Sequence, residues 1–115
     1  MKVAIVGSRT FNDYLALKKF ISDTIDINQI EYIVSGGAKG ADFLGQNYAE
    51  ELKLPIKIFE ADWDKFGKSA GYIRNVDIVK ESTVVFAFWD GKSRGTRHTI
   101  DLCRKHLKPV YIFKF

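Results

Sequence analysis

The sequence has little of several residue types that define whole classes of protein. Its single cysteine, Cys103, excludes an internal disulfide framework and a multi-cysteine zinc site. His98 and His106 are the only histidines, so we expect no bound metal. We also expect no cofactor. There are only two prolines, and there is no repeat, low-complexity run or proline-rich linker. A length of 115 residues is that of one domain, which predicts a single domain over residues 1–115.

Long hydrophobic runs are also absent. No stretch approaches the roughly 20 apolar residues that a membrane-spanning helix needs. The amino terminus, Lys2-Val-Ala-Ile-Val-Gly7, is typical of a buried strand and not of a signal peptide. We therefore expect no membrane partner and a cytoplasmic location, in the host cytoplasm if the source is a mobile element.

A strong charge of one sign is missing too, since the net charge is only +4. Residues 1–57 carry seven basic and seven acidic side chains, whereas residues 58–115 carry eleven basic and seven acidic ones. The surplus in the second half is compatible with an anionic partner, although an ordinary solvated surface explains it equally well.

Short apolar segments instead alternate with longer amphipathic ones. The apolar segments, rich in β-branched and aromatic residues, are 3–6, 32–34, 56–59, 84–88 and 110–113. Four segments between them have helical periodicity: one capped by Asn12 or Asp13, then 41–52, 69–80, and one that starts near Thr96 and carries Ile100, Cys103 and Leu107 on one stripe. This alternation predicts an α/β, Rossmann-like, doubly wound parallel sheet of five strands, with helices on both faces and every strand covered on both sides.

In such a sheet the ligand crevice lies at the carboxyl ends of the strands, so the loops after the strands are the candidate sites. The first loop is Gly7-Ser8-Arg9, where a simple turn with a surface arginine is the alternative interpretation. The second, 35–42, places three glycines and Lys39 directly before a helix, which favours binding of a phosphate or carboxylate. It matches neither the dinucleotide fingerprint nor the triphosphatase loop, and a tight connection is again an alternative.

The other two loops also combine glycines with polar and basic residues. The segment 61–75 is long for a connection in so small a domain, and Trp63 in it suits stacking on a base or plugging the edge of the core. Arg74 lies early in the following helix, where it can bind an anion with two hydrogen bonds. The segment 89–96 provides a second glycine-containing helix start. We expect His98 to be an exposed polar side chain and Cys103 to fill the core.

Several motifs together resemble the SLOG superfamily, and most of all its small, stand-alone YspA-like branch. They are Gly-Ser-Arg at 7–9, Val-Ser-Gly-Gly-Ala-Lys-Gly-Ala-Asp at 34–42, Ala-Asp-Trp-Asp-Lys-Phe-Gly at 61–67, Ala-Gly-Tyr-Ile-Arg-Asn at 70–75 and Phe-Trp-Asp-Gly-Lys-Ser-Arg-Gly-Thr at 88–96. The superfamily includes the Lonely Guy phosphoribohydrolases and the Rossmann-like domain of DNA-processing protein A. The resemblance implies the strand order 3-2-1-4-5 and a crevice between the loops after strands one, two and four.

The resemblance implies binding or sensing of a nucleotide or nucleotide-derived ligand, with oligomerisation as a further expectation. Amides at 36–41 and 94–96 would hold phosphate, Arg9, Lys39, Arg74 and Arg94 would neutralise it, and Trp63 or Trp89 would cover the base. The predicted ligand-binding residues are Gly7, Ser8, Arg9, Ser35, Gly36, Gly37, Ala38, Lys39, Gly40, Asp42, Trp63, Arg74, Asn75, Trp89, Asp90, Ser93, Arg94, Gly95 and Thr96.

Two alternatives remain open. Cleavage of an N-glycosidic bond would follow the Lonely Guy enzymes, whose Gly-Thr matches residues 95–96 and whose helical arginine matches Arg74, the one catalytic candidate. The catalytic glutamate of those enzymes falls on Thr99, which has no useful pKa for acid–base work. Binding of single-stranded DNA would follow DNA-processing protein A, whose resemblance rests on the residues at 7–9, 35–42 and 74–75.

Overall fold

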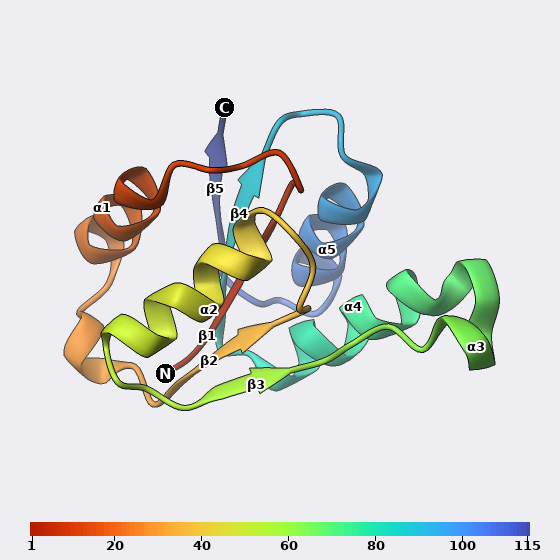
Figure 1. Ribbon diagram of the computed structural model, residues 1–115, viewed down its shortest axis with the longest axis horizontal. Helices are drawn as coiled ribbons and strands as arrows, with labels where there is room; N and C mark the ends of the chain where they lie inside the picture. The colour runs from red at the N-terminus through yellow and green to blue at the C-terminus, as the bar shows by residue number, and fades with distance from the viewer.

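The computed structural model describes all 115 residues and contains one parallel sheet of five strands (Figure 1). The strands are β1 (Lys2–Gly7), β2 (Tyr32–Ser35), β3 (Ile56–Ile58), β4 (Val84–Trp89) and β5 (Val110–Lys114). Their order is β3-β2-β1-β4-β5, which confirms the predicted order. The central strand β1 pairs with β2 and with β4, so the loops after these three strands lie at one edge of the sheet.

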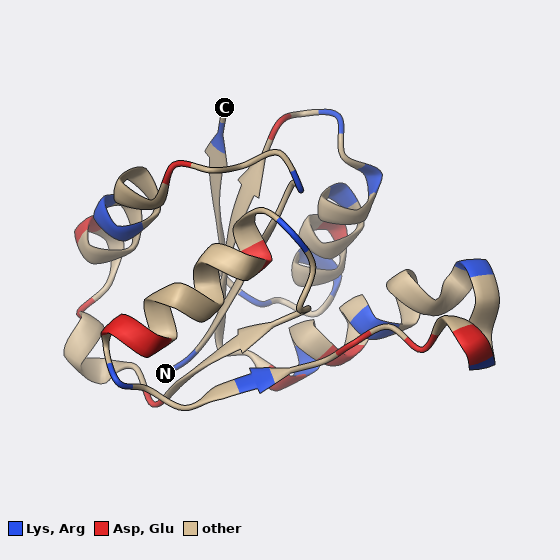
Figure 2. Cartoon of the chain, viewed as in Figure 1, with Lys and Arg blue, Asp and Glu red and all other residues tan.

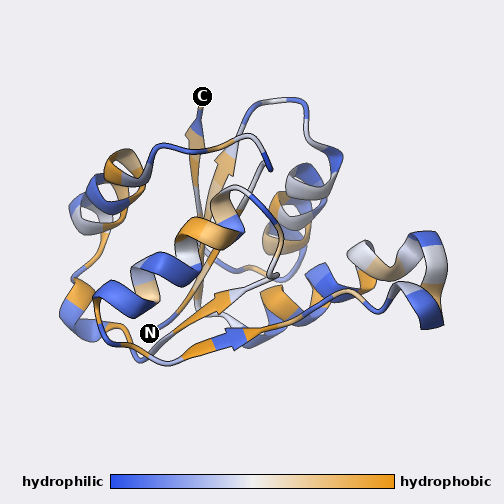
Figure 3. Ribbon diagram, in the orientation of Figure 1, coloured by the Kyte–Doolittle hydropathy of each residue, from blue (hydrophilic) through white to orange (hydrophobic).

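Each face of the sheet is covered by two helices. The helices α1 (Tyr14–Thr24) and α2 (Ala41–Glu51) lie on one face, and α4 (Ala70–Glu81) and α5 (Arg94–Lys105) lie on the other. Successive side chains of β1 alternate between the two cores: Val3 and Ile5 pack with α1 and α2, whereas Ala4 and Val6 pack with α4 and α5. Figure 3 shows the corresponding hydrophobic colour along the central strands.

Side chains satisfy free amides at the starts of α1 and α5, but not at the starts of α2 and α4. Asp13 caps α1, because its carboxylate accepts a hydrogen bond of 3.0 Å from the Ala16 amide. Ser93 caps α5 in the same way through the Thr96 amide. At α2 the cap position is Gly40, which offers no side chain. No helix combines the length and the apolar character that a membrane crossing requires.

Two details differ from the sequence-based predictions. Strand β3 is not buried on both faces, since Ile56 and Ile58 are 36% and 40% exposed. It is an edge strand of three residues that pairs only with β2. Leu107 does not belong to the buried stripe of α5 either: the helix ends at Lys105, and Leu107 is 90% exposed in a turn with a positive φ of 56°.

The segment 61–75 is not simply a long loop. It contains the short helix α3 (Trp63–Phe66), the 3₁₀ turn η2 (Gly67–Ser69) and the start of α4. Every side chain from Asp62 to Ser69 is exposed. Figure 1 shows that this segment, which we call the arm (residues 61–69), extends beyond the end of the sheet. A further 3₁₀ turn, η1 (Ile27–Gln29), precedes β2.

Candidate functional site

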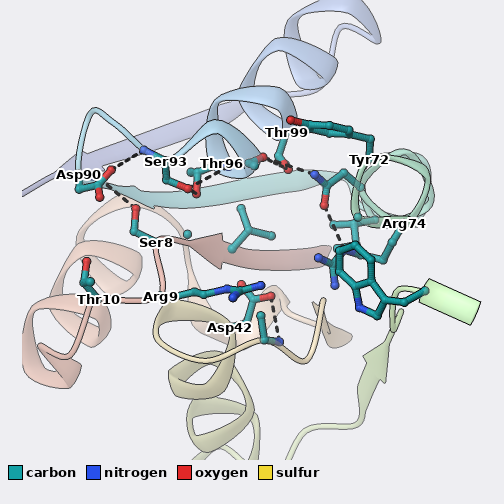
Figure 4. A pocket seen from close by; sticks show the side chains of 18 of the residues that line it. Ser8, Arg9, Thr10, Asp42, Tyr72, Arg74, Asp90, Ser93, Thr96 and Thr99 are labelled. Carbon is teal, nitrogen blue, oxygen red and sulfur yellow. Dashed lines mark hydrogen bonds between the residues drawn. The ribbon is translucent and has the colours of Figure 1, made fainter. Parts of the chain in front are cut away.

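A cavity of about 500 Å³ opens at the carboxyl ends of β1, β2 and β4 (Figure 4). Its walls come from the loops after β1, β2 and β4 and from the arm with the first turns of α4. The volume lies within the range typical of small-molecule sites. The structure therefore brings the three predicted loops around one crevice and adds a fourth wall.

Two glycines let these loops approach one another so closely. A Cβ on Gly7 would lie 2.3 Å from the Phe88 carbonyl oxygen and 2.8 Å from the Ala41 Cβ. A Cβ on Gly40, whose φ is +75°, would lie 2.4 Å from the Ser8 carbonyl oxygen. Backbone hydrogen bonds join the same segments, from the Ser8 amide to the Phe88 carbonyl at 2.8 Å and from the Ala41 amide to the Ser8 carbonyl at 3.3 Å. No larger residue fits at these contacts.

Arg74 is held in the wall of the cavity by three hydrogen bonds. Its Nε donates to the Asn75 Oδ1 at 3.1 Å, and its Nη1 donates to the carbonyl oxygens of Gly36 at 2.7 Å and Phe59 at 3.4 Å. Its Nη2 makes no hydrogen bond within the chain, so two of the five guanidinium donors remain free. The result is a fixed cation that can bind an anion in the cavity (Figure 4).

Asn75, which is buried, connects Arg74 to helix α5. Its Nδ2 lies 3.4 Å from the Gly95 carbonyl oxygen and 3.2 Å from the His98 Nδ1. The His98 ring packs edge-to-face on Tyr72, with 4.5 Å between ring centroids. Burial lowers the pKa of His98, although the charge of Asp101 acts in the opposite direction. His98 is therefore part of the α4–α5 contact, where we had expected an exposed side chain.

Asp42 is a buried carboxylate beside the glycine-rich turn. It is 5% exposed, and its Oδ2 accepts a hydrogen bond of 3.4 Å from the Ala38 amide. Burial raises the pKa of Asp42 to about 6, while the amides of Ala38, Gly7 and Gly36 and the charge of Arg74 act in the opposite direction. The Ala38 amide of the glycine-rich turn is thus already bound to the Asp42 carboxylate.

Asp90 and Ser93 build the turn that leads into α5. The Asp90 Oδ1 accepts hydrogen bonds from the amides of Lys92 at 2.8 Å and Ser93 at 2.7 Å, and these bonds lower the pKa of Asp90. The Asp90 amide donates to the Ser8 Oγ at 3.2 Å, which ties this turn to the loop after β1. The first helical hydrogen bond of α5 runs from Arg97 to the Ser93 carbonyl, so the amides of residues 94 and 95 precede it.

The cavity lining includes many of the residues predicted from the sequence. They are Gly7, Ser8, Arg9, Ala38, Asp42, Trp63, Arg74, Asn75, Asp90, Ser93, Gly95 and Thr96. The predicted residues that do not line it are Ser35, Gly36, Gly37, Lys39, Gly40, Trp89 and Arg94. Residues 37–40 border a second, shallower hollow with Phe43, and the Trp89 Nε1 donates to the Ser93 carbonyl at 3.0 Å. The binding roles of both groups stay predictions.

Sequence reasoning missed five polar or small residues of the lining: Thr10, Lys68, Gly71, Tyr72 and Thr99. Thr10 directly follows the Gly-Ser-Arg motif, and the two motifs of the arm and α4 flank Lys68 and include Tyr72. Their position in or next to these motifs was the sequence signal that indicates them as lining residues. Thr99, one turn after Gly95 in α5, is buried and donates its hydroxyl to the Gly95 carbonyl at 3.2 Å.

Comparisons with known proteins show a family, a relative and a solved structure to which this chain is similar. The model of the YspA, cpYpsA-related SLOG family matches residues 1–66. Gene 61 protein of Mycobacterium phage D29 is 33% identical over 121 residues, which cover 97% of this chain and 95% of that protein. DNA processing protein A from Helicobacter pylori, which binds single-stranded DNA, has a similar fold with a TM-score of 0.72 and 24% identity. The match covers 97% of this chain but only 64% of that one.

Proposed function

Because this chain belongs to the YspA, cpYpsA-related SLOG family, we propose that it binds a nucleotide or nucleotide-derived phosphorylated ligand in the cavity at the carboxyl ends of its strands. Membership of the family and the fold shared with a DNA-binding protein support a nucleotide or nucleic-acid role. The observation that carries the more specific proposal is Arg74, a cation fixed by three hydrogen bonds with Nη2 left free in a cavity of small-molecule size.

The phosphate would bind near Arg74. Arg9 and Lys68 line the same cavity and form no ion pair within the chain. Guanidinium groups suit phosphate because their donors match its oxygens in pairs. Gly95, at the start of α5, also lines the cavity, and its amide precedes the first helical hydrogen bond, so it is a further donor for the phosphate.

The rest of a nucleotide would meet aromatic and hydroxyl groups. Trp63 and Tyr72 line the cavity and are 55% and 45% exposed, so each has a ring face available for stacking on a base. Ser8, Thr10 and Thr96 bring hydroxyl groups to the lining, which suit the hydroxyl groups of a sugar. This mixture of cations, aromatic rings and hydroxyls favours a nucleotide over inorganic phosphate.

The test is a thermal-shift screen with nucleoside monophosphates and diphosphates, cyclic nucleotides and ADP-ribose. Arg74→Gln removes the fixed cation, and Arg104→Gln removes an exposed arginine from the last turn of α5 as the matched control. We expect at least one compound to raise Tm in the wild type and in Arg104→Gln, but not in Arg74→Gln. The absence of stabilisation by every phosphorylated compound would overturn the proposal.

Asp42 favours a second candidate function, cleavage of an N-glycosidic bond in a nucleotide. Thr99 stands where the related hydrolases carry a glutamate, but Asp42 is a buried carboxyl in the same cavity with a pKa of about 6. A carboxyl with a pKa near neutrality is suited to acid–base catalysis. Chromatography of nucleoside monophosphates incubated with the protein would show release of the base, and Asp42→Asn would abolish it. If the wild type released no base from any of the common monophosphates, this candidate would be rejected.

Binding of single-stranded DNA is a third candidate, supported by the fold of DNA processing protein A and by the basic surplus in residues 58–115. Trp63 would then stack on one base of a strand. The salt dependence of binding separates this candidate from a small-molecule site.

A further inference from the structure

We propose that His98 is a positioning residue for the cavity: its neutral imidazole, acting through the side-chain amide of Asn75, holds the Arg74 guanidinium in its binding orientation. The connection is a chain of hydrogen bonds from α5 to α4 and on to the loop after β2. The effect of His98 on ligand binding rests on the proposed function, whereas the hydrogen-bonded connection from His98 to Arg74 does not.

The chemistry of the three partners fixes the direction of each hydrogen bond. The Arg74 Nε can only donate, so the atom of Asn75 that faces it is the oxygen Oδ1. The Gly95 carbonyl can only accept, so the atom that faces it is Nδ2. The same Nδ2 lies 3.2 Å from the His98 Nδ1, which must therefore accept. His98 is thus neutral with its proton on Nε2.

Protonation of His98 would disrupt this chain. A proton on Nδ1 would face the Nδ2 hydrogens of Asn75, and two donors repel. The amide would have to turn its Oδ1 toward His98, which takes the acceptor away from the Arg74 Nε and the donor away from the Gly95 carbonyl. Arg74 would keep only the hydrogen bonds of its Nη1 and gain freedom to rotate.

The groups around His98 favour its neutral form. Burial disfavours the imidazolium and lowers the pKa, while Asp101, three residues along α5, favours the charged form less strongly. The Tyr72 ring on α4 packs edge-to-face with the imidazole, and Arg74 on α4 and Arg97 on α5 add positive charge nearby in the chain.

The strands against which α5 packs add little charge. Between Val84 and Trp89, β4 carries no titratable side chain, and Lys2 lies at the opposite end of β1 from the cavity. On β5, Tyr111 stacks on Phe86 in the core of α1 and α2, and Lys114 lies against Gly91. Asp42, which has a pKa of about 6 and whose charge interacts with Arg74, titrates in the same pH range. The pH response assigned to His98 is therefore the part that disappears in a variant without the imidazole.

Two variants separate the acceptor from the titration. His98→Asn places an oxygen near the former Nδ1, so it keeps an acceptor for Asn75 but does not titrate. His98→Leu removes the acceptor. Circular dichroism and Tm show whether both variants are folded. If His98→Leu does not fold, the comparison of wild type with His98→Asn still tests the inference.

The first readout is the NMR spectrum of the ligand-free protein labelled with ¹⁵N, recorded from about pH 8 to pH 5. In the wild type we expect the Arg74 Nε–H signal and the Asn75 amide signals to move with the titration of His98. In His98→Asn only the part of the shift that the titration of Asp42 causes should remain. An Arg74 signal that ignores both the titration of His98 and the removal of its acceptor would overturn the inference.

The second readout is the affinity for ADP-ribose, whose phosphates keep their charge over this pH range. We expect the wild type to lose about tenfold in affinity relative to His98→Asn between pH 7.5 and pH 5, equivalent to about 1.4 kcal/mol. The ratio of the affinities of the two proteins removes the contribution of Asp42 to the pH dependence, because both proteins retain this residue. Equal pH profiles would overturn the role in binding. If NMR showed the coupling but neither ADP-ribose nor any other compound of the thermal-shift panel bound at any pH, the inference would stand and the proposed function would be wrong.

Discussion

At the scale of single residues, Gly36 lies beside the two charged side chains of the cavity, Arg74 and Asp42. A Cβ at this position would lie 2.7 Å from both the Arg74 Nη1 and the Asp42 Oδ2. Because Gly36 has no positive φ, its backbone would tolerate alanine. The requirement for glycine therefore comes from the two side chains that pack against it.

Gly36→Ala should destabilise the fold by about 1–3 kcal/mol, because the new methyl group displaces Arg74 or Asp42. Urea unfolding measures the loss, and the ligand-induced thermal shift should disappear as well. Gly95→Ala is the control: it is helical and has open space around it, so we expect unchanged stability or a gain of up to about 1 kcal/mol. Equal stability of the two variants would contradict this account of Gly36.

Asp42 predicts a pH-dependent stability. Its pKa of about 6 in the folded protein exceeds the ordinary value of 3.8, so the folded state binds the proton more tightly than the unfolded state. The contribution of the protonated carboxyl is complete below about pH 4 and is lost as the pH rises through about 6. Asp42→Asn should thus gain stability relative to the wild type between these values, by about 3 kcal/mol at most.

Urea unfolding of wild type and Asp42→Asn at pH 4.5 and pH 7.5 checks this prediction. Asp64→Asn, which removes an exposed carboxylate of the arm, is the control and should show no such pH-dependent gain. A stability difference between Asp42→Asn and wild type that is the same at both pH values would show that the carboxyl is not strained by burial.

The sequence predicts the loops of the site better than it predicts their partners. Glycines and polar residues directly after apolar segments indicate which loops meet, because parallel strands end at one edge. The hydrogen bonds from Asn75 to His98 and from Arg74 to Gly36 depend on how α4 packs beside α5 and β2. No local sequence pattern predicts the distances between these elements. For the same reason, the sequence suggested an exposed His98.

At the scale of elements, the arm supplies Trp63, one of the two aromatic residues that line the cavity with exposed rings. Trp63 is more than half exposed, and its ring lies against Gly71 at the start of α4. Trp89, by contrast, packs against the core beneath α4 and α5 and uses its indole N–H within the chain. Of the two tryptophans predicted to cover a base, the role therefore falls on Trp63.

Trp63→Ala should weaken binding of AMP by about 1–3 kcal/mol, because stacking on the base is lost. Binding of ribose 5-phosphate, which has no base, should change little. Isothermal titration with the two compounds measures both effects, and Phe66→Ala, a second exposed aromatic residue of the arm, is the control. An equal loss for AMP and ribose 5-phosphate would mean that Trp63 acts on the shape of the arm and not on the base.

Element order and type follow from the sequence because apolar segments and amphipathic stripes alternate clearly. The edge strand β3 illustrates the limit: Ile56 and Ile58 look like buried strand residues, but burial depends on a covering neighbour that the edge lacks. Leu107 continues the apolar spacing of α5, yet the helix ends two residues earlier. The periodicity of apolar residues predicts which face of a helix or strand is apolar. It does not predict how far along that face neighbouring elements cover it.

At the scale of the whole molecule, the charge distribution favours a small ligand over a long strand. Figure 2 shows lysines and arginines spread over several elements, with acidic residues between them. Proteins that follow a nucleic-acid backbone neutralise many phosphates at once and lose affinity steeply with salt. The net charge of +4 and the few cations of the cavity predict a shallow dependence.

Fluorescence polarisation with a labelled oligothymidylate, repeated over a series of salt concentrations, tests this prediction. We expect weak binding that loses less than about tenfold in affinity between 50 and 200 mM salt, as for one or two phosphate contacts. A loss of about a thousandfold would instead indicate many phosphate contacts and favour the single-stranded DNA candidate.

The most direct test of the central claim is the mapping of a bound nucleotide on the backbone amide NMR spectrum. Titration with the compound that gives the largest thermal shift should perturb amides of residues 7–10, 36–42, 63–75 and 90–99, the segments that enclose the cavity. The same titration of Arg74→Gln should leave the spectrum unchanged at equal concentrations. Perturbations confined to the amino ends of the strands, or to helix α1, would contradict the claim.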